Sequence, residues 1–251
     1  MYPTDLTDSQ YEVIKKFVGE HRKRKYSLKR IISGILYLCK TGAQWRLLPK
    51  EFPRWQLVYY YFNKWMKTGI WEQIQTHLRK MVRNKQGRKE CPSMAIIDSQ
   101  SVKNSEWGIP DKGFDGNKRI KGRKRHIMVD TLGILLGIIV TEANVHDSVA
   151  ARALLKKMKG KLPRLKRILA DAGYMGDGLV RLARKWLNCV FEVVKRSEEK
   201  GFKVIPTRWI VERSIAWFNW SRRLSRDYEG NMRTSENWAY IASINMLLKK
   251  I

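Results

Sequence analysis

The sequence predicts an α/β layer preceded by an all-helical domain. Apolar residues recur at the spacing of an amphipathic helix from Thr7 to about Leu78. A polar, basic stretch at 83–93 interrupts this pattern, and short apolar runs that alternate with helical segments follow it. We therefore expect a helical domain at residues 1–85 and an α/β domain at residues 93–251.

The N-terminal helices have recognisable start signals. Thr7 and Ser27 are expected N-caps, and Gly42 and Pro49 punctuate the connections. A helix, a short turn and a second helix, with the basic run HRKRK (21–25) alongside, are compatible with a helix-turn-helix that contacts DNA. A plain helical bundle has the same pattern, so both interpretations stay open.

The second half alternates between short strands and helices. Helical segments are expected near 148–157, 177–187 and 206–224, with Pro206 in the first turn of the last one. The stretch 235–251 is predicted to be an amphipathic helix that packs on the core or supports a dimer. The expected strands cover residues 94–98, 125–130, 135–143, 167–171 and 189–194.

The charge balance indicates a polyanionic partner. The chain has 51 Lys and Arg against 23 Asp and Glu, a formal net charge of +28. The positive charge is spread over the whole length and interleaved with 10 Trp and 10 Tyr, which favours nucleic acid over a lipid surface. No apolar run is long enough to span a bilayer, and the first ten residues lack a signal-peptide pattern, so we expect a cytoplasmic protein without membrane contact.

Three carboxylates stand out against this basic background. Asp98 is expected to end the first strand and Asp171 the fourth, and ligands of open α/β sheets bind beyond such strand ends. Glu212 lies within the long apolar-faced helix that follows the fifth strand. Three acids in a basic protein suit phosphodiester chemistry, because carboxylates hold Mg²⁺ while Lys and Arg bind the DNA backbone.

Each acid also has a plainer interpretation. A single Asp at a strand end commonly forms a turn or caps a helix. Glu212 could pair with Arg208 or Arg213 on its own helix. Asp130, at a hairpin turn, and Asp147, before a helix, are rival candidates. The metal-site interpretation therefore depends on the three acids taken together.

Several motifs, in this order, resemble one family. The runs IIDSQSVK, GFDGNKRIKGRKRHIMVDTLG, ANVHDS, LADAGYMGD and RWIVERSIAWFNWSRRLSRDYE are similar to those of the DDE transposases of bacterial insertion sequences, specifically the large insertion sequence "five" family. The preceding GAQWRLLP and FPRWQLVYYYFNKW resemble the helical domain before the catalytic core of the same proteins. The resemblance covers nearly the whole chain.

This resemblance implies a ribonuclease H-like mixed sheet with flanking helices. Its three metal-binding acids carry over onto Asp98, Asp171 and Glu212, with Mg²⁺ as the cofactor and Mn²⁺ able to substitute. It implies that water cleaves the strand at the element's end and that the freed 3′-hydroxyl attacks target DNA. The implied partners are double-stranded DNA, as terminal inverted repeats and target, and further copies of the chain in a dimer or larger multimer.

One departure from the family concerns the signature Tyr, Arg, Glu, Lys of the last helix. Arg208, a candidate DNA contact, and Glu212 fit it, but the Tyr position is Ile205 and the Lys position is Asn219. The phosphate contact is then expected from two residues one helical turn further on, Arg222 and Arg223.

A basic segment at 117–126 leads into the second strand. We expect it to form a phosphate-binding lip, the alternative being a solvated strand edge. Tyr174 is expected either to stack on an unpaired base or to pack in the core. The candidate contacts in the segment are Lys118, Arg119, Arg123, Lys124 and Arg125.

A transposase is the function that these observations favour. A stand-alone nuclease of the same fold would hydrolyse DNA without joining strands. A non-catalytic DNA-binding protein derived from a transposase would be favoured if one acid were missing, and all three are present.

Overall fold

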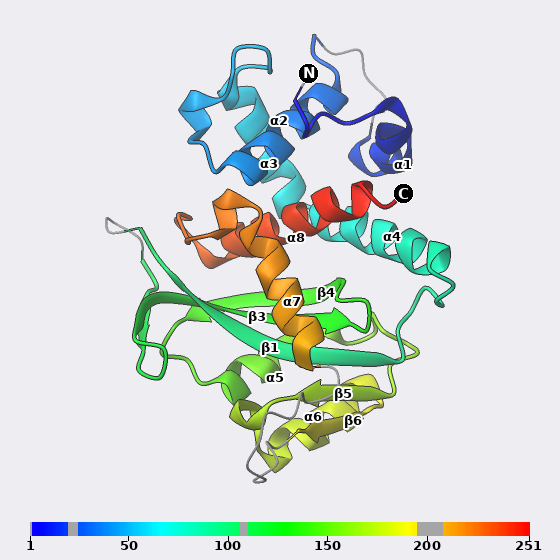
Figure 1. Ribbon diagram of the computed structural model, residues 1–251, viewed down its shortest axis with the longest axis vertical. Helices are drawn as coiled ribbons and strands as arrows, with labels where there is room; N and C mark the ends of the chain where they lie inside the picture. The colour runs from blue at the N-terminus through cyan, green and yellow to red at the C-terminus, as the bar shows by residue number, and fades with distance from the viewer. Residues whose placement is uncertain (1, 20–24, 106–109, 195–207) are drawn as a thin grey trace.

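The computed structural model describes residues 2–19, 25–105, 110–194 and 208–251. Figure 1 shows the N-terminal helices at one end of the molecule, the sheet in the lower half and the pair α5 and α6 at the opposite end. The basic run at 21–25, apart from its last residue, and Pro206 lie outside the described residues.

The N-terminal helices begin where the sequence predicts. The Thr7 hydroxyl accepts a hydrogen bond from the Gln10 amide at 3.1 Å, and Ser27 caps its helix through the Arg30 amide at 3.3 Å. Both predicted N-caps are confirmed, because each hydroxyl satisfies an amide that the first helical turn leaves unpaired. The elements are α1 (Asp8–Val18), α2 (Leu28–Thr41), the 3₁₀ turn η1 (Trp45–Leu47), α3 (Trp55–Lys67) and α4 (Ile70–Lys85).

A mixed sheet follows. Within the described residues the strand order is β2-β3-β1-β5-β6, with β4 paired to β3. β1 pairs antiparallel with β3 and parallel with β5, and β5 pairs parallel with β6. This is the ribonuclease H-like mixed sheet that the resemblance implied, and the predicted fold class is confirmed. The strands are β1 (Met94–Lys103), β2 (Gly113–Asp115), β3 (Ile120–Asp130), β4 (Leu135–Glu142), β5 (Arg167–Ala170) and β6 (Val190–Val193).

Helices cover both faces of the sheet. Side chains of β1 alternate, so Ile96 packs with α7, α8 and the N-terminal helices, while Ala95 and Ile97 pack against α5 and α6. No helix in the described ranges has both the length and the apolar character needed to cross a membrane. The remaining elements are α5 (Asp147–Met158), the 3₁₀ turn η2 (Ala172–Tyr174), α6 (Asp177–Leu187), α7 (Arg208–Asn219), the 3₁₀ turn η3 (Arg222–Leu224) and α8 (Met232–Leu248).

Three elements differ from the predicted ranges. β1 continues five residues beyond the expected strand end at 98, and β3 begins at Ile120 rather than at 125. Both extensions are polar segments that pair with one another, so the loss of apolar residues did not mark a strand end. The last expected helix divides into α7 and η3.

The helical region and the sheet share one hydrophobic core. The Gln75 side chain of α4 donates to the Leu135 carbonyl at 2.7 Å and to the Ser243 hydroxyl of α8 at 3.3 Å. Arg83, also on α4, forms a buried ion pair with Asp130, whose other oxygen accepts the backbone amide of Ile134 at 2.9 Å. Asp130 therefore closes the β3–β4 turn, at the hairpin position that the sequence predicted, and is paired with Arg83. The domain limits at 85 and 93 stay a prediction.

Replacing Asp130 with Ala is expected to lower the free energy of unfolding by about 3–5 kcal/mol, because Arg83 would remain as an uncompensated buried charge. The side chain of Arg83 is 5% exposed and that of Asp130 is 0% exposed. Urea denaturation at pH 7 measures the change. Glu12→Ala, which breaks an exposed pair with Lys15, is the control and should cost about 0.5 kcal/mol or less. Equal effects of the two substitutions would contradict a structural role for the buried pair.

Candidate active site

Asp98 and Asp171 lie level with one another on neighbouring parallel strands. The β1–β5 ladder pairs Ile96 with Leu169, an offset of 73 positions (169 − 96 = 73). The same offset separates the two aspartates (171 − 98 = 73). Because side chains alternate along a strand, both carboxylates follow Ile96 and Leu169 onto the face covered by α7 and α8. The two strands that carry these aspartates are therefore neighbours in the sheet.

Asp98 does not end its strand, so that part of the prediction is wrong. β1 runs on to Lys103, and Asp98 pairs across the antiparallel ladder with Ile127 of β3. The carboxylate is half-buried and accepts the backbone amide of Ser99 at 2.7 Å. Asp98 is thus held in the middle of a rigid strand, which fixes the carboxylate more firmly than a loop would.

Asp171 stands directly after β5, as predicted, and also caps η2. Its Oδ1 accepts the Gly173 amide at 3.0 Å. A Cβ atom at Gly173 would lie 3.2 Å from that oxygen and 3.2 Å from Oδ2 of Asp147. The two aspartates therefore flank the same glycine, where any larger residue would crowd both carboxylates.

Glu212 lies on α7, which packs over β1 and β3 on the face that carries the two aspartates. Figure 1 shows α7 crossing the sheet on this side. The Glu212 side chain is exposed. Seven positions later, and so on the same side of the helix, Asn219 Oδ1 accepts a hydrogen bond from Gln100 Nε2 at 3.3 Å. The helix face with Glu212 is thereby aligned with the strand face with Asp98.

Sequence reasoning missed Gln100. It lies two positions beyond Asp98, so it shares the face of that carboxylate, and it joins β1 to the end of α7. The signal that could have identified Gln100 is its spacing: on a strand, a residue two positions from Asp98 points to the same face of the sheet. Asn219, which stands where the family signature has Lys, is the other partner of this contact.

Two of the three predicted metal ligands are positioned to bind a hard divalent cation together. The oxygens of Asp98 and Asp171 are the ligands that Mg²⁺ takes, one or two carboxylates being usual with water completing the shell. Among the described residues, no three His, Cys, Asp or Glu side chains are grouped closely enough to hold one ion. The structure therefore aligns the two aspartates and does not bring Glu212 together with them.

The opposite face of the sheet carries a buried polar cluster. Lys124 Nζ lies 3.2 Å from Asp147 Oδ1 and donates to the Val145 carbonyl at 3.1 Å. His126 Nδ1 lies 3.6 Å from the same Asp147 oxygen, and its Nε2 is 3.0 Å from the Thr141 hydroxyl. Burial lowers the pKa of His126 to about 4, although the Asp147 carboxylate opposes this shift. Asp147 thus pairs with Lys124 inside the fold.

Tyr174 packs in the core, which was one of its two predicted roles. Its side chain is fully buried, so stacking on a DNA base is wrong for this residue. Burial raises its pKa first, and the carboxylates of Asp147, Asp98 and Asp171 raise it further. The phenol of Tyr174 is therefore a neutral group of the core that α5 and α6 cover.

Arg123 and Arg125 are buried, and the predicted phosphate-binding lip is wrong at these positions. Arg123 donates to the carbonyls of Pro110 at 2.8 Å and Glu229 at 2.9 Å, and Arg125 donates to the Leu224 carbonyl at 2.7 Å. Burial lowers the pKa of Arg125 to about 10, so it stays cationic at neutral pH. The physical reason is that β3 lies between β1 and β4, where both faces are covered.

The other predicted DNA contacts divide by exposure. Lys124 is buried at its ion pair with Asp147. Arg223 is buried against Trp238 and bonded to Glu229 at 2.7 Å. Neither side chain offers a free surface charge, so both predicted DNA contacts are corrected. The side chain of Arg208, the first residue of α7, lies outside the described part of the structure. The exposed candidates are Lys118, Arg119 and Arg222.

Sequence comparison agrees with this architecture. Residues 89–247 match the family described as "Transposase DDE domain", and residues 6–75 match "Putative transposase of IS4/5 family". The first match covers more than half of the chain. The chain therefore belongs to the family of transposases with a DDE domain.

One curated relative matches about half of the chain. The protein described as "Putative transposase for insertion sequence element IS402" from Burkholderia cepacia is 34% identical over 143 residues, which are 53% of this chain and 64% of that protein. The matched part thus spans somewhat less than two thirds of that relative.

Solved structures show only a weak likeness. The Mos1 transposase paired-end complex with left transposon end gives a TM-score of 0.29 at 12% identity, over 92% of this chain and 80% of that chain. The Mos1 strand transfer complex gives 0.28 at 11% identity, over 92% and 79%. At these TM-scores the likeness decides neither the fold nor the function of this chain.

His126 is expected to stay neutral until the pH falls to about 4. Free histidine titrates near pH 6.5, so the unfolded chain binds this proton first. The contribution of neutral His126 to stability is therefore present above pH 6.5 and is lost as the pH falls toward 4. Imidazole chemical shifts in an NMR titration measure the pKa directly.

The matching stability experiment compares the native chain with His126→Gln by urea denaturation at several pH values. Between pH 6.5 and 4.5 the native chain should lose more stability than the variant, by up to about 1.4 kcal/mol per pH unit. Parallel losses in the two proteins would show that His126 is not the group being titrated.

Proposed function

We propose that this protein is a DNA transposase that cleaves strands at the ends of a mobile element and transfers the 3′-hydroxyl into target DNA. The observation that carries the proposal is the alignment of Asp98 with Asp171 on the sheet face that α7, with Glu212, covers. Membership of the DDE family supports the reaction class. The strand chemistry itself, the Mg²⁺ cofactor and the roles of individual residues belong to the proposal.

The acids have distinct tasks in this proposal. Asp98 and Asp171 would hold the cation through their carboxylate oxygens, which a strand and a 3₁₀ turn keep in position. Glu212 supplies the third carboxylate from α7, and its approach to the two aspartates is part of the proposal. When bound, Mg²⁺ would activate the attacking oxygen and stabilise the leaving oxygen of an in-line displacement, with Mn²⁺ able to replace it.

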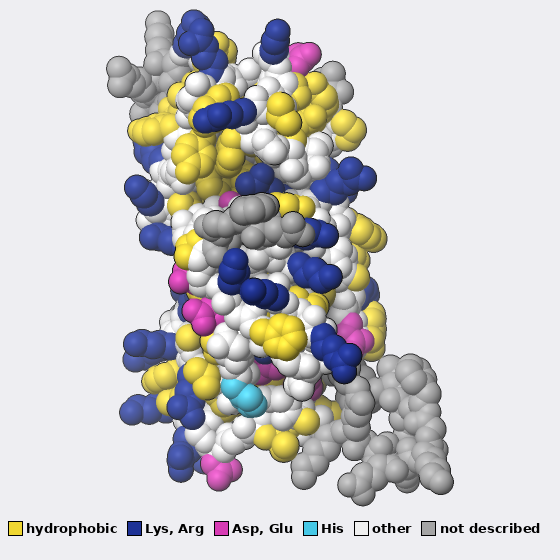
Figure 2. Space-filling model, turned by 90° about the vertical axis from the view of Figure 1, so that its left-hand side faces the viewer, with side chains coloured by type: hydrophobic (Ala, Val, Ile, Leu, Met, Phe, Trp, Pro, Cys, Tyr) yellow, Lys and Arg dark blue, Asp and Glu magenta, His cyan; other side chains and the backbone are white. Residues whose placement is uncertain are grey.

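The positive charge of the surface suits binding of the DNA backbone. Figure 2 shows Lys and Arg side chains distributed over one face along the length of the molecule, with few Asp and Glu between them. Lys118 is exposed and donates to the Ser99 carbonyl at 3.2 Å, directly beside Asp98. In this proposal Lys118 holds a phosphate near the reacting bond, and Arg119 and Arg222 bind neighbouring phosphates of the backbone.

The proposed partners are double-stranded DNA at the element's terminal inverted repeats and at the target. Two ends must be held together for transfer, so we propose that the chain acts as a dimer or larger multimer on DNA. The cytoplasmic location stays a prediction.

Asp98→Asn, Asp171→Asn and Glu212→Gln are each expected to abolish Mg²⁺-dependent joining of a labelled element end into plasmid, because each removes a carboxylate that binds the metal. DNA binding by gel shift should be nearly unchanged. Asp177→Asn, an exposed acid at the start of α6, is the matched control and should join normally.

The joining assay, run on the native chain and on the three acid variants, also separates the possible functions. Nicking without joining by the native chain would favour a stand-alone nuclease, and binding with neither reaction would favour a non-catalytic DNA-binding protein. Joining by Glu212→Gln with no joining by the two Asp variants would remove Glu212 from the site.

Replacing Lys118 and Arg119 with Ala together is expected to weaken binding to all DNA sequences alike. The slope of log affinity against log salt should fall by about one for each phosphate that the variant no longer binds, up to about two for the pair. The control is Arg184→Ala with Lys185→Ala, two exposed charges on α6 across the sheet. An equal change of slope in both double variants would mean that Lys118 and Arg119 add only general charge.

A further inference from the structure

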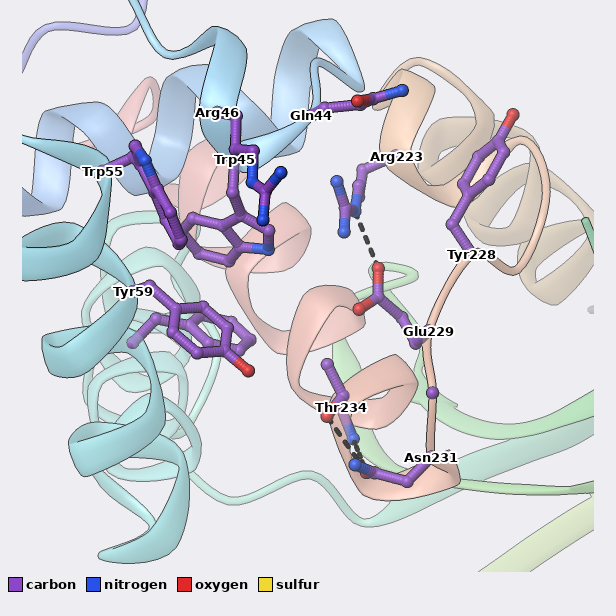
Figure 3. Close-up of a pocket in the computed structure, with 12 residues that line it drawn as sticks. Gln44, Trp45, Arg46, Trp55, Tyr59, Arg223, Tyr228, Glu229, Asn231 and Thr234 are labelled. Atoms are coloured by element: carbon purple, nitrogen blue, oxygen red, sulfur yellow. Dashed lines mark hydrogen bonds and ion pairs between the residues drawn. The ribbon is translucent and has the colours of Figure 1, made fainter. Parts of the chain in front are cut away.

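A pocket of about 550 Å³ lies where the helical region meets the segment that follows α7. Figure 3 shows the rings of Trp45, Trp55 and Tyr59 on one side and Arg223, Glu229 and Asn231 on the other. The first group comes from η1 and α3, and the second from η3 and the turn before α8. None of these residues belongs to the carboxylate site described above.

The aromatic side is rigid and partly exposed. Trp45 is held from behind by Phe62 at 5.3 Å and Trp238 at 5.8 Å between ring centres, and both of these rings are buried. The ring of Tyr59 meets Trp45 edge to face at 5.0 Å and remains 42% exposed. Because these rings are already held in place, binding does not cost the entropy of ordering them, and their flat faces favour a flat aromatic ligand.

The polar side is fixed as well. Arg223 Nε donates to Glu229 Oε1 at 2.7 Å and Arg223 Nη1 donates to the Ala43 carbonyl at 3.1 Å. Asn231 uses its Oδ1 to cap α8, accepting the Thr234 amide at 2.8 Å. Its side-chain NH₂ is therefore the end left to donate to a ligand. Donors and acceptors thus face the aromatic wall, as recognition of a heterocycle edge requires.

The charge of the pocket decides between ligands. Arg46 is exposed at the rim, with its guanidinium 5.8 Å from the Trp55 ring centre, and Arg223 lies on the opposite side. The exposed Arg46 beside the Trp55 ring suits a base that brings its own phosphate, since the rings receive the base and Arg46 receives the anion. A paired base is buried within the duplex stack, so the ligand has to be unpaired.

We infer that this pocket, which we call the Trp45–Glu229 pocket, binds one unpaired nucleobase of the DNA held by the protein. The inference rests on the proposed function for the presence of DNA and adds a site that is separate from the carboxylates. The base stacks on the exposed ring of Tyr59 and presents its edge to Glu229 and Asn231.

The test uses DNA duplexes that carry one unpaired 2-aminopurine, as a bulge or a terminal overhang, and a matched duplex in which that base is paired. The native protein should bind the unpaired probes more tightly and quench their fluorescence. Tyr59→Leu should reduce affinity for the unpaired probes by about tenfold, the size of one base–aromatic stack, and leave the paired duplex unchanged. Tyr60→Leu, 56% exposed and outside the pocket, is the matched control and should behave as the native chain.

The outcomes separate this inference from the proposed function. Equal quenching and affinity in Tyr59→Leu and Tyr60→Leu would overturn the inference while duplex binding persists. An equal loss on paired and unpaired probes would overturn it too, because Tyr59 would then contact duplex DNA. If the native chain bound none of the probes, the proposed function itself would fail, and this inference with it. Thermal unfolding of each variant confirms that the fold is intact.

Discussion

The parallel pairing of β1 with β5 is the constraint on which the rest of the site depends. Its register places Asp98 beside Asp171 and turns both carboxylates toward α7. A slip of one residue in either strand would send one carboxylate to the opposite face, against α5 and α6. That slip would also move Ile96 or Leu169 out of the core that they share with the N-terminal helices, so apolar burial enforces this register.

The second constraint is the burial of cationic side chains in β3. An arginine inside a sheet is costly unless every donor finds an acceptor. Here most of the donors find acceptors in η3 and the turn after it, whose carbonyls receive Arg125 and Arg123, and in Asp227, which also accepts the Ser235 hydroxyl at 2.7 Å. Among the described residues, Arg125 Nε has no hydrogen-bond partner. The basic run that resembles a DNA-binding surface is therefore an internal scaffold that ties the C-terminal segment to the sheet.

The sequence predicted those features that depend on local chemistry. Hydroxyls at Thr7 and Ser27 cap helices through amides three residues away, and Asp171 follows a short apolar strand, so nearby residues were sufficient. The prediction that the strand ends at Asp98 was wrong because the strand continues through polar residues. These residues pair with β3, which lies some 25 positions away in the sequence. The burial of Arg123 was hidden for the same reason, since two of its acceptors, Asp227 and the Glu229 carbonyl, lie about 100 positions later. Exposure of charged residues cannot be predicted where long-range partners satisfy them.

The central strand also relates the two sites to one another. Arg125 of β3 lies opposite Gln100, two positions from Asp98, and its guanidinium donates to Leu224 beside Arg223 of the Trp45–Glu229 pocket. Gln100 in turn donates to Asn219 at the end of α7 at 3.3 Å and accepts from Arg125 at 3.5 Å. The strand that carries Asp98, the helix that carries Glu212 and the polar wall of the pocket are thus linked by a chain of hydrogen bonds, of which the one to Leu224 is short and buried. A base held in the pocket would therefore be fixed at a set position relative to the acids. Arg125 stays cationic at neutral pH, so its bonds to the Leu224 and Arg226 carbonyls can be broken only at the cost of a buried charge, which ties the polar wall of the pocket to β3.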